Sequence, residues 1–438
     1  MLNLLRKIIP KPLIKAYHYT LAIAADFFYG SPSDKLIVIG VTGTSGKSSV
    51  VYLIAKILEK AGYKVGVTST FFFKVDKKEW LNNKKMTMIG RLALQKLIKQ
   101  MVKANCQYAV IETTSQGIEQ FRHLGINYDI LVLTNLYPEH IEAHGGFANY
   151  KNAKLKLFKK LKNDSPKLIA GEKIKKTIIA NLDDENANDF LKNWAEEKLV
   201  FTLTNKSTNQ GRVIRAENQK ITAEGIEFVI DRQPFELKFF GQHNVYNSLA
   251  AITVGLSQGL SLASMAKSLM EIEGIPGRVE FINEGQPFKV IVDYAYEPKA
   301  VSALYQIIKL IPHQKVIQVL GSAGGGRDII RRPKLGQLAG QAADLVIVTN
   351  EDPYDDDPQT IIDQVAAGAI EAGKKFNENL FKILDRRKAI SKALGLAQPN
   401  DLVLITGKGC EQAMAVKGKN IPWDDRAVVR EELAKIRN

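Results

Sequence analysis

Gly40-Val41-Thr42-Gly43-Thr44-Ser45-Gly46-Lys47-Ser48-Ser49 is the stretch that decides how this chain folds. It follows the apolar run 36–39 and precedes a helical pattern at 50–55, which gives the order strand, glycine loop, helix. Glycines let backbone N–H groups close around phosphate oxygens at the N-terminus of the following helix. In such a loop Lys47 reaches the β- and γ-phosphates, and the Ser48 hydroxyl ligates Mg²⁺. Val41 stands where the standard pattern has its first glycine, but the remaining spacing still forms a phosphate cradle. We therefore expect ATP to bind at Gly43, Thr44, Ser45, Gly46, Lys47, Ser48 and Ser49, with a flexible glycine–serine turn as the alternative interpretation.

The composition is that of a globular chain with a basic balance. Its 438 residues are long enough for two or three domains, and 45% hydrophobic with 24% charged residues is ordinary for folded proteins. Lysine and arginine number 61 against 46 aspartate and glutamate, and the net charge of +15 favours an anionic partner. The basic residues are scattered and lack interleaved aromatic residues. We therefore expect a nucleotide and an anionic metabolite as partners, and no nucleic acid.

Cysteine usage and hydropathy exclude several protein classes. Cys106 and Cys410 are the two cysteines, which excludes a disulfide framework and a four-cysteine zinc site. Such usage fits a reducing compartment, so we expect a cytoplasmic protein. No apolar run of the sequence approaches the roughly 18 residues of a membrane span.

The N-terminal segment has the pattern of an amphipathic helix. Basic residues accompany apolar residues at helical spacing: Arg6, Lys7, Lys11 and Lys15 with Leu13, Ile14, Tyr17, Leu21, Ala25 and Phe28. Pro10, Pro12 and Asp26 argue against a signal peptide. Two interpretations stay open: a helix packed on the nucleotide-binding domain, or a helix that contacts a membrane surface or a lipid-linked substrate.

From residue 36 onward, apolar runs alternate with helical patterns. The predicted buried strands are 36–39, 108–111, 130–134 and 178–181, then 290–293, 316–320, 345–348 and 402–405. Between about 198 and 240, short alternating segments such as 226–230 predict a small antiparallel patch. The segment Gly274-Ile275-Pro276-Gly277-Arg278 predicts a hinge. We expect an α/β fold with a helical segment 1–35, a central P-loop domain 36–278 with a mostly parallel sheet, and a Rossmann-like doubly wound domain 279–438.

Polar side chains follow two predicted strands of the central domain. Glu112 ends one strand, and His140 lies beyond the next strand along the chain. Because open α/β sheets bind ligands at the carboxyl ends of their strands, both side chains can face the phosphates held by Lys47. A carboxylate is a natural Mg²⁺ ligand and a neutral imidazole is a less usual one. Taken singly, Glu112 and His140 are each explained equally well as a hydrogen-bonded polar residue at the end of a strand.

An ordered set of motifs resembles the Mur ligases over residues 36 to 438. Besides the phosphate loop and the Glu112 segment, the motifs are Thr134-Asn135 with Glu139-His140, Tyr150-Lys151-Asn152-Ala153-Lys154, Gly241-Gln242-His243-Asn244-Val245-Tyr246-Asn247, Gly277-Arg278, Asp293-Tyr294-Ala295, Arg331-Arg332-Pro333 and Gly407-Lys408-Gly409-Cys410-Glu411. Each motif alone is modest, whereas the ordered set is specific. The branch it resembles most adds the third residue of the peptidoglycan stem peptide.

The resemblance implies an ATP-dependent, ADP-forming amide ligase. ATP phosphorylates a peptide carboxylate, the amine of an incoming amino acid attacks the acyl phosphate, and phosphate leaves. Both approaching partners are anionic, so Lys47 and two Mg²⁺ ions offset their charge.

The resemblance also implies roles for individual residues. Lys47, Glu112, His140 and Lys154 are the implied catalytic residues, and Ser48, Glu112, His140 and Lys154 the implied Mg²⁺ ligands, with Lys154 matching a lysine that the family carbamylates to N6-carboxylysine. Asn244, Asn247, Arg278 and Asp293 match nucleotide contacts. Thr114, Gln120 and Arg122 match contacts to the muramoyl peptide, and Arg122 suits a carboxylate because its guanidinium binds in a bidentate fashion. Arg327, Asp352, Tyr354, Gly407 and Glu411 match contacts to the incoming amino acid.

The chain departs from the family pattern at several places. About 35 residues precede the first strand, where the family has a uridine-nucleotide domain on the order of 100 residues. The Thr-Thr-Pro segment of the family is Thr87-Met88-Ile89 here, the Glu112 pattern ends in Gln116, an aspartate is replaced by Glu139, and a histidine by Tyr296. We still expect activity, because Glu112, His140 and Lys154 are retained.

The segment that selects the amino acid reads Glu351-Asp352-Pro353-Tyr354. Enzymes of the family that take meso-diaminopimelate have Asp-Asn-Pro-Arg, whose arginine binds the distal carboxylate. Tyr354 cannot supply that charge. Asp352 resembles the acidic position of the lysine-adding branch and suits a distal ammonium group. We expect L-lysine or another diamino acid.

Two other functions stay open. One is a related ligase whose acceptor is a lipid-linked wall precursor, a folate-like molecule or an archaeal-type wall peptide; with this acceptor or a muramoyl peptide, we expect a monomer. The other is a non-catalytic ATP-binding subunit of a two-protein complex, which predicts a broken metal site.

Overall fold

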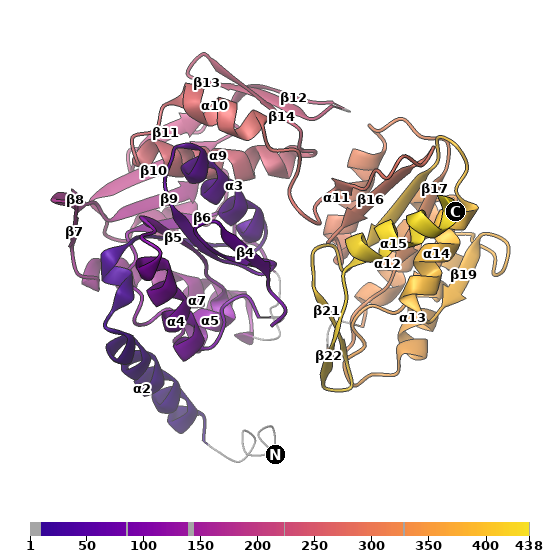
Figure 1. Ribbon diagram of the computed structural model, residues 1–438, viewed down its shortest axis with the longest axis horizontal. Helices are drawn as coiled ribbons and strands as arrows, with labels where there is room; N and C mark the ends of the chain where they lie inside the picture. Colours follow the sequence, from indigo (N-terminus) through magenta and orange to yellow (C-terminus); the bar gives the residue numbers. More distant parts are fainter. Residues whose placement is uncertain (1–9, 85, 139–143, 223, 327–328, 438) are drawn as a thin grey trace. The chain divides into compact units, whose positions relative to one another are not determined.

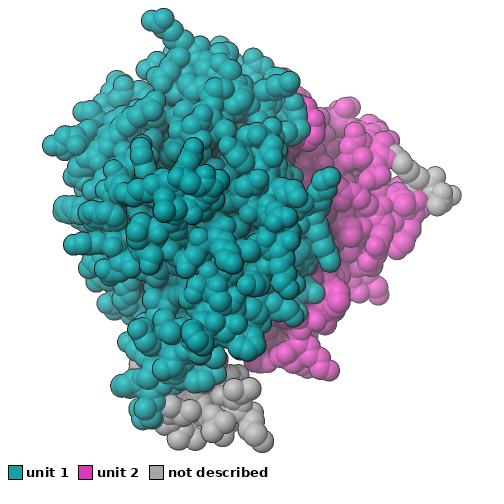
Figure 2. Space-filling view, turned by 60° about the vertical axis from the view of Figure 1, so that its left-hand side comes forward, with its two compact units in different colours: residues 1–220, 226–237, 242–272 teal, residues 221–225, 238–241, 273–438 magenta. Residues whose placement is uncertain are grey.

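The chain forms two compact α/β units (Figure 2). The computed structural model describes residues 10–84, 86–138, 144–222, 224–326 and 329–437. Unit 1 comprises residues 1–220, 226–237 and 242–272, and unit 2 comprises residues 221–225, 238–241 and 273–438. Each unit has its own mostly parallel sheet, which confirms the predicted fold class. The domain boundaries expected at residues 35 and 278 stay predictions.

Unit 1 is built on a nine-stranded sheet (Figure 1). In spatial order its strands are β11 (Arg212–Arg215), β10 (Glu197–Thr202), β9 (Thr177–Asn181), β6 (Ile130–Leu133), β1 (Ile37–Thr42), β5 (Tyr108–Glu112), β2 (Val65–Thr68), β3 (Phe72–Val75) and β4 (Lys78–Leu81). The strands from β11 to β2 are parallel, and β3 and β4 form an antiparallel edge. The central strand β1 is apolar along its length because helices cover both of its faces.

Helices cover both faces of this sheet. On one face, α4 (Arg91–Lys103), α7 (Phe147–Lys160) and α8 (Ala187–Leu191) bury Leu97, Ile98, Leu157, Phe158 and Phe190 in a single core. Three further helices pack on one another: α3 (Lys47–Lys60), α9 (Gln242–Ser257) and α10 (Leu262–Met270). The short α5 (Ser115–Glu119) follows β5 directly and packs on α7.

The N-terminal helix α2 (Lys11–Tyr29) packs on α4 and leads into β1 through the 3₁₀ turn η1 (Pro32–Lys35). Its buried residues Ala22 and Ala25 are small, which allows a close approach. The helix predicted from the sequence is therefore present. No helix among the described residues is long and apolar enough to cross a membrane.

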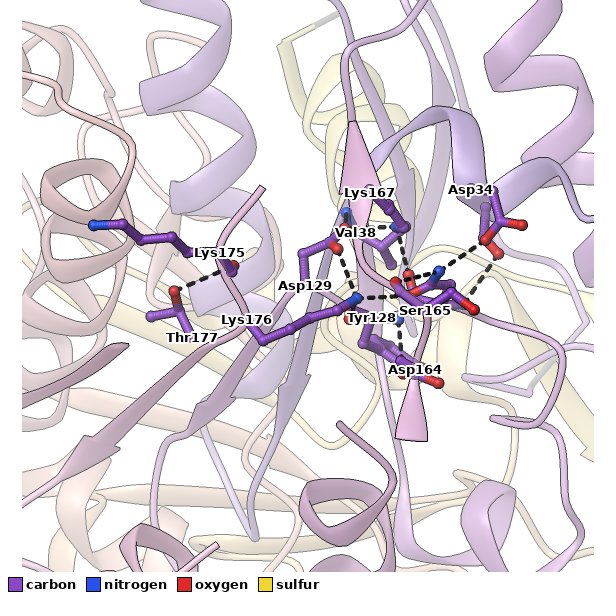
Figure 3. Close-up of polar contacts among 12 residues, drawn as sticks. Asp34, Val38, Tyr128, Asp129, Asp164, Ser165, Lys167, Lys175, Lys176 and Thr177 are labelled. Atoms are coloured by element: carbon purple, nitrogen blue, oxygen red, sulfur yellow. Dashed lines mark hydrogen bonds and ion pairs between the residues drawn. The ribbon is translucent and has the colours of Figure 1, made fainter. Parts of the chain in front are cut away.

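A buried ion cluster fixes the edge of the sheet where β1, β6 and β9 begin (Figure 3). Asp129 is fully buried between Lys167 and Lys176, whose Nζ atoms lie 2.6 and 2.9 Å from its carboxylate oxygens. The Asp129 carboxylate also accepts the backbone N–H of Val38 at 2.8 Å. Lys167 stands on the small hairpin of β7 (Lys167–Ile169) and β8 (Glu172–Ile174). Burial lowers the pKa of Lys167 to about 8 against the opposing effect of Asp129.

Unit 2 contains a six-stranded sheet (Figure 1). In spatial order its strands are β15 (Glu280–Phe281), β16 (Lys289–Asp293), β20 (Leu402–Thr406), β17 (Val316–Leu320), β18 (Leu345–Thr349) and β19 (Leu380–Ile383), and only β15 is antiparallel to its neighbour. One face is covered by α11 (Pro298–Ile308), α12 (Arg331–Ala342) and α13 (Pro358–Glu371), and the other by α14 (Arg386–Leu396) and α15 (Asp425–Arg437). The hairpin of β21 (Ala413–Val416) and β22 (Lys419–Pro422) lies before α15.

The antiparallel patch predicted between about 198 and 240 is smaller than expected. It consists of β12 (Glu217–Ile221), β13 (Ile226–Ile230) and β14 (Gln233–Leu237), with β13 and β14 antiparallel. The earlier part of the segment forms β10 and β11, which extend the large sheet in parallel. Parallel strands are usually joined by a helix. No helix lies among the described residues that connect β10 and β11, so the sequence gives no indication that these two strands are parallel.

Candidate active site

The glycine loop lies between β1 and α3, as its sequence predicts. Gly46 has φ +78°, and a Cβ atom there would lie 2.4 Å from Asn247 Oδ1. A Cβ atom on Gly43 would lie 1.9 Å from Thr134 Oγ1. Both glycines are therefore needed for space, because the loop packs tightly against the end of β6 and the start of α9.

The residues after β6 hold the loop in place. Asn135 Oδ1 accepts the N–H of Ser45 at 2.9 Å, and its backbone carbonyl accepts the N–H of Thr44 at 2.9 Å. The Thr134 hydroxyl donates to the carbonyl of Ser45 at 2.7 Å. The sequence analysis gave no such role to Thr134 and Asn135. The signal available was their position at the carboxyl end of the strand next to β1.

Two lysines meet at one carbonyl of the loop. Lys47 Nζ donates to Gly43 O at 3.2 Å and to Thr44 O at 2.9 Å. Lys154 Nζ, on the buried side of α7, donates to the same Gly43 O at 2.8 Å. Lys154 is 1% exposed and lies 4.5 Å from the centre of the Tyr150 ring. A buried amine on the phosphate loop is not the solvent-exposed helix lysine that the local sequence suggests.

Ser48 and Glu112 form a buried pair at the carboxyl ends of β1 and β5. The Ser48 hydroxyl donates to Glu112 Oε2 at 2.9 Å, and Thr70 donates to both carboxylate oxygens, through its N–H at 2.8 Å and its hydroxyl at 2.9 Å. A hydroxyl and a carboxylate are oxygen donors of the kind that Mg²⁺ takes, and they suit an ion completed by phosphate oxygens. The described residues contain no group of three or more His, Cys, Asp or Glu side chains that could hold a metal alone.

The residues expected to bind the peptide lie together near α5. The Thr114 side chain caps α5 by accepting the N–H of Gly117 at 3.1 Å. Arg122 donates to Gln120 Oε1 at 2.6 Å and to the carbonyl of Met88. Arg91, which the sequence analysis missed, donates to the carbonyl of Gln120. Two guanidinium groups therefore converge on this segment.

A histidine lies on the same side of the sheet. Ser115 Oγ and His144 Nε2 are 3.0 Å apart. Burial lowers the pKa of His144, as do Lys154 and Lys156, against the opposing effect of Glu119. His140 and Arg327, two of the expected site residues, lie outside the described residues.

The asparagines of α9 lie beside the loop. Asn247 Nδ2 donates to Asn244 Oδ1 at 2.9 Å, and both side chains are buried. Since Asn247 Oδ1 is the atom that a Gly46 side chain would meet, the pair forms one wall of the phosphate loop.

In unit 2, Arg278 and Asp293 are neighbours. Asp293 accepts the backbone N–H groups of Val279 at 2.7 Å and Ala295 at 2.6 Å. Burial raises the pKa of Asp293, while Arg278 opposes this effect. The Arg278 guanidinium lies 4.7 Å from the centre of the Tyr294 ring. Asp293 thus holds the turn after β16, and its contact with a nucleotide stays a prediction.

The predicted amino-acid segment of unit 2 is an acidic cluster around a buried lysine. Lys408 is fully buried and donates to Asp352 Oδ2 at 3.0 Å and to Glu411. Asp352 also accepts the N–H of Ala415 at 2.7 Å, and Glu411 accepts the hydroxyl of Tyr294 at 2.9 Å. The acid at position 352 is therefore part of a buried ion pair.

Two neighbours complete this cluster. Tyr354 has φ +53° and is fixed by its backbone, which accepts from Lys417 at 2.7 Å and donates to Ala415 at 2.9 Å. Burial and the adjacent Asp352 raise the pKa of Glu351 to about 7. The cations Arg386, Lys408 and Arg331 act in the opposite direction. A Cβ atom on Gly407 would lie 2.3 Å from Glu351 Oε2, and this oxygen has no hydrogen-bond partner among the described residues.

Comparison with known proteins identifies the family. The Mur ligase middle domain matches residues 41–255, and the domain described as "Mur ligase, glutamate ligase domain" matches residues 277–409. A UDP-N-acetylmuramyl-tripeptide synthetase from Roseiflexus sp. is 36% identical over 98% of this chain and 85% of its own length. The chain belongs to the Mur ligase family. It is thus an ATP-dependent acid–amino-acid ligase of peptidoglycan synthesis, and the resemblance read from its motifs is confirmed.

Other relatives agree with this assignment. A UDP-N-acetylmuramoyl-L-alanyl-D-glutamate–2,6-diaminopimelate ligase from Geobacillus kaustophilus is 35% identical over 96% of this Mur ligase and 84% of its own length. A solved structure of a 2,6-diaminopimelate ligase has TM-score 0.60 and 28% identity, and covers 92% of this chain and 79% of its own. The folylpolyglutamate synthase of Mycobacterium tuberculosis, with TM-score 0.67 and 16% identity over 90% of this chain and 92% of its own, shows the shared fold alone.

Proposed function

We propose that this Mur ligase adds an amino acid to the terminal carboxylate of a muramoyl dipeptide, forming the third peptide link of a peptidoglycan precursor. The observation that carries the proposal is the convergence of Lys47 and Lys154 on the Gly43 carbonyl next to the Ser48–Glu112 pair. The names of the relatives, a tripeptide synthetase and a diaminopimelate ligase, support the same step. The acceptor is nucleotide-linked or lipid-linked, and the enzyme acts as a monomer in the cytoplasm.

The reaction has two steps. A carboxylate oxygen of the acceptor attacks the γ-phosphorus of ATP, and ADP leaves. The amine of the incoming amino acid then attacks the acyl carbon, loses a proton, and phosphate leaves with the carboxylate oxygen. A carboxylate is a poor electrophile until phosphorylated, and Lys47 offsets the charge of two anions brought together.

Ser48 and Glu112 would hold Mg²⁺, with His140 and Lys154 as the further ligands. The ion would polarise phosphate oxygens and offset their charge. Glu112 is held by two hydrogen bonds from Thr70, so its carboxylate is already oriented. Asn244 and Asn247 in unit 1, and Arg278 and Asp293 in unit 2, contact the nucleotide.

Lys154 acts as a carbamate. Addition of CO₂ to its neutral amine forms an N–C bond and releases one proton, which turns the side chain into an anion suited to Mg²⁺. The Lys154 amine donates to Gly43 O in the structure, and the carbamate nitrogen keeps one N–H that can make the same hydrogen bond. The position on the loop is thereby compatible with both forms of the side chain.

The peptide carboxylate is bound by Arg122, with Thr114 and Gln120 placing the peptide. Arg122 already lies against Gln120 and Met88, so its guanidinium is ordered before the substrate arrives. A planar guanidinium pairs with a carboxylate through two hydrogen bonds.

The third residue is L-lysine or another diamino acid. Asp352 and Glu411 both pair with the buried Lys408, and Arg331 and Arg386 act with Lys408 on the neighbouring Glu351. The preference for a distal ammonium group rests on the acid at position 352 and on Tyr354, which carries no charge where the diaminopimelate-adding enzymes have an arginine. Gly407 and Glu411, with Arg327 and Tyr354, complete the contacts to the amino acid.

Phosphate release tests the proposal directly. The purified protein is given ATP, Mg²⁺ and UDP-N-acetylmuramoyl-L-alanyl-D-glutamate, and then L-lysine, L-ornithine or meso-diaminopimelate in turn. We expect release that depends on both the acceptor and a diamino acid. Release with meso-diaminopimelate alone would overturn the assignment of the amino acid. No release from protein that binds ATP would overturn the acceptor and point to a lipid-linked or non-muramoyl substrate.

A further inference from the structure

One side of α2 is apolar and exposed. The helix packs on α4 through Ala22 and Ala25, both 1% exposed. Its other side carries large apolar residues that are all exposed: Leu13, Tyr17, Tyr19, Ile23, Phe27 and Phe28. Phe27 and Phe28 are 86% and 76% exposed, although a soluble helix usually places such residues in the core. A contiguous exposed apolar face marks an interaction surface.

The exposed charge of α2 is basic. Among the described side chains of the helix, Lys15 is exposed near its start, whereas the acid Asp26 is partly buried and accepts a hydrogen bond from Ser31 Oγ at 3.0 Å. In the sequence, Arg6, Lys7, Lys11 and Lys15 precede the first acidic residue, Asp26. Residues 1–9 of the sequence are apolar apart from Asn3, Arg6 and Lys7. This combination of aromatic, aliphatic and basic residues complements an anionic, amphipathic surface.

The C-terminal end of α2 is firmly anchored to unit 1. The following turn η1 is held by Asn127, whose N–H donates to Ser33 Oγ at 3.0 Å and whose side chain donates to Asp34 at 2.8 Å. Asn127 Oδ1 in turn accepts Lys176 Nζ at 2.6 Å in the buried ion cluster (Figure 3). The helix is therefore fixed to the sheet at this end and to α4 along one side. It can neither turn its apolar side inward nor leave the unit without breaking these contacts.

We propose that the exposed face of α2 docks the protein on a membrane surface that contains anionic lipids. The helix lies along the surface, because its other side is occupied by α4. Phe27, Phe28 and Tyr17 enter the boundary between headgroups and acyl chains, and Lys15 pairs with lipid phosphate. A second copy of this chain fits the face less well, since a symmetric contact would bring its basic residues together. The proposal is independent of the acceptor and the amino acid of the ligase reaction.

Vesicle sedimentation with the full chain tests the proposal. The probes are vesicles of phosphatidylcholine alone and of phosphatidylcholine with a minority of phosphatidylglycerol. We expect the protein to sediment with the phosphatidylglycerol vesicles and to be released as salt is raised. Phe27→Ser with Phe28→Ser should weaken binding at least about tenfold, because two buried aromatic side chains are lost. Lys15→Gln should weaken it by about fivefold.

A matched control distinguishes binding through the face of α2 from non-specific adsorption of the protein to vesicles. Leu168 is 77% exposed on β7 of the same unit, so Leu168→Ser removes a comparable apolar side chain elsewhere. It should leave vesicle binding unchanged. Equal sedimentation of the wild type and the double Phe variant would overturn the proposal, as would equal binding to vesicles without anionic lipid. A dimer seen by light scattering that the double Phe variant dissociates would assign the face to a second copy and also overturn it.

Discussion

Glycines with positive φ differ in the space that surrounds them. Gly46 has φ +78° and faces Asn247 Oδ1, while Gly62, at the end of α3, has φ +92° and no atom within 4 Å of an added Cβ. We predict that Gly46→Ala weakens ATP binding at least tenfold, since α9 must move to admit the methyl group. Gly62→Ala should cost only about 1 kcal/mol of unfolding free energy and leave ATP binding intact. Calorimetric titration with ATP on both variants checks the pair, and equal affinities would contradict it.

The two lysines on Gly43 O should behave differently when removed. Lys47→Ala should abolish turnover, because nothing else on the loop offsets the γ-phosphate charge. Lys154→Ala should be inactive too, but a short carboxylate such as acetate should partly restore its phosphate release by replacing the carbamate. The matched control is Lys47→Ala with the same carboxylate, which should not recover. Full activity of Lys154→Ala without any addition would remove Lys154 from the site.

A buried histidine makes the stability of unit 1 sensitive to acid. Burial lowers the pKa of His123 to about 3, and Lys160 and Lys156 act in the same direction. Between pH 6.5 and about 3 the unfolded chain binds a proton that the folded chain does not, so stability falls as the pH falls. The loss from this residue is at most about 1.4 kcal/mol per pH unit. Denaturant unfolding at several pH values should show this loss in the wild type and a smaller one in His123→Gln; parallel curves would contradict the assignment.

At the scale of residues, the phosphate loop was predictable from the sequence because its glycines, lysine and serine stand at a fixed local spacing. The roles of Asn135 and Arg91 were not predictable, because both residues act through contacts with residues far along the chain. The contact of Asp352 with the amino acid stays a prediction, whereas its pairing with Lys408, which the structure shows, had no sign in the sequence. That pairing depends on the return of the chain after β20, which no local pattern predicts.

At the scale of elements, the helices α12 and α13 approach through their glycines. A Cβ atom on Gly368 would lie 1.9 Å from the carbonyl oxygen of Pro333, and one on Gly336 would lie 1.8 Å from that of Val365. We predict that Gly368→Ala destabilises unit 2 by about 3 kcal/mol, because backbone atoms must separate. Gly395, in α14, has open space and should gain up to about 1 kcal/mol as Gly395→Ala. Denaturant unfolding of the two variants measures the expected loss of unfolding free energy in Gly368→Ala and the expected gain in Gly395→Ala. A Gly368→Ala variant as stable as the wild type would contradict the close packing.

The elements themselves were largely predictable. Apolar runs at 108–111 and 316–320 became β5 and β17, because parallel strands buried on both faces need continuous apolar sequence. The positions of β10 and β11 were not predictable, since their short connection resembles that of an antiparallel pair. The exposed side of α2 was visible as an apolar pattern, but only the structure shows which side packs on α4.

At the scale of the whole molecule, each of the two α/β units holds its own group of proposed site residues. Unit 1 holds the phosphate loop, the Ser48–Glu112 pair and the Arg122 segment, and unit 2 holds the acidic cluster around Lys408. Some of the ordered motifs stand at the ends of strands, such as the phosphate loop after β1 and Glu112 at the end of β5, whereas Lys154 lies within α7 and Asn247 within α9. The chain spans 85% of the length of its relative from Roseiflexus.

The most direct test of the ligase chemistry follows one oxygen atom. The acceptor is prepared with heavy oxygen in its terminal carboxylate and turned over with ATP, Mg²⁺ and the diamino acid. If the carboxylate attacks the γ-phosphorus, one labelled oxygen must leave with the inorganic phosphate, and mass spectrometry of that phosphate will show it. Unlabelled phosphate released together with a new peptide product would contradict an acyl phosphate and, with it, the roles given to Lys47 and Lys154.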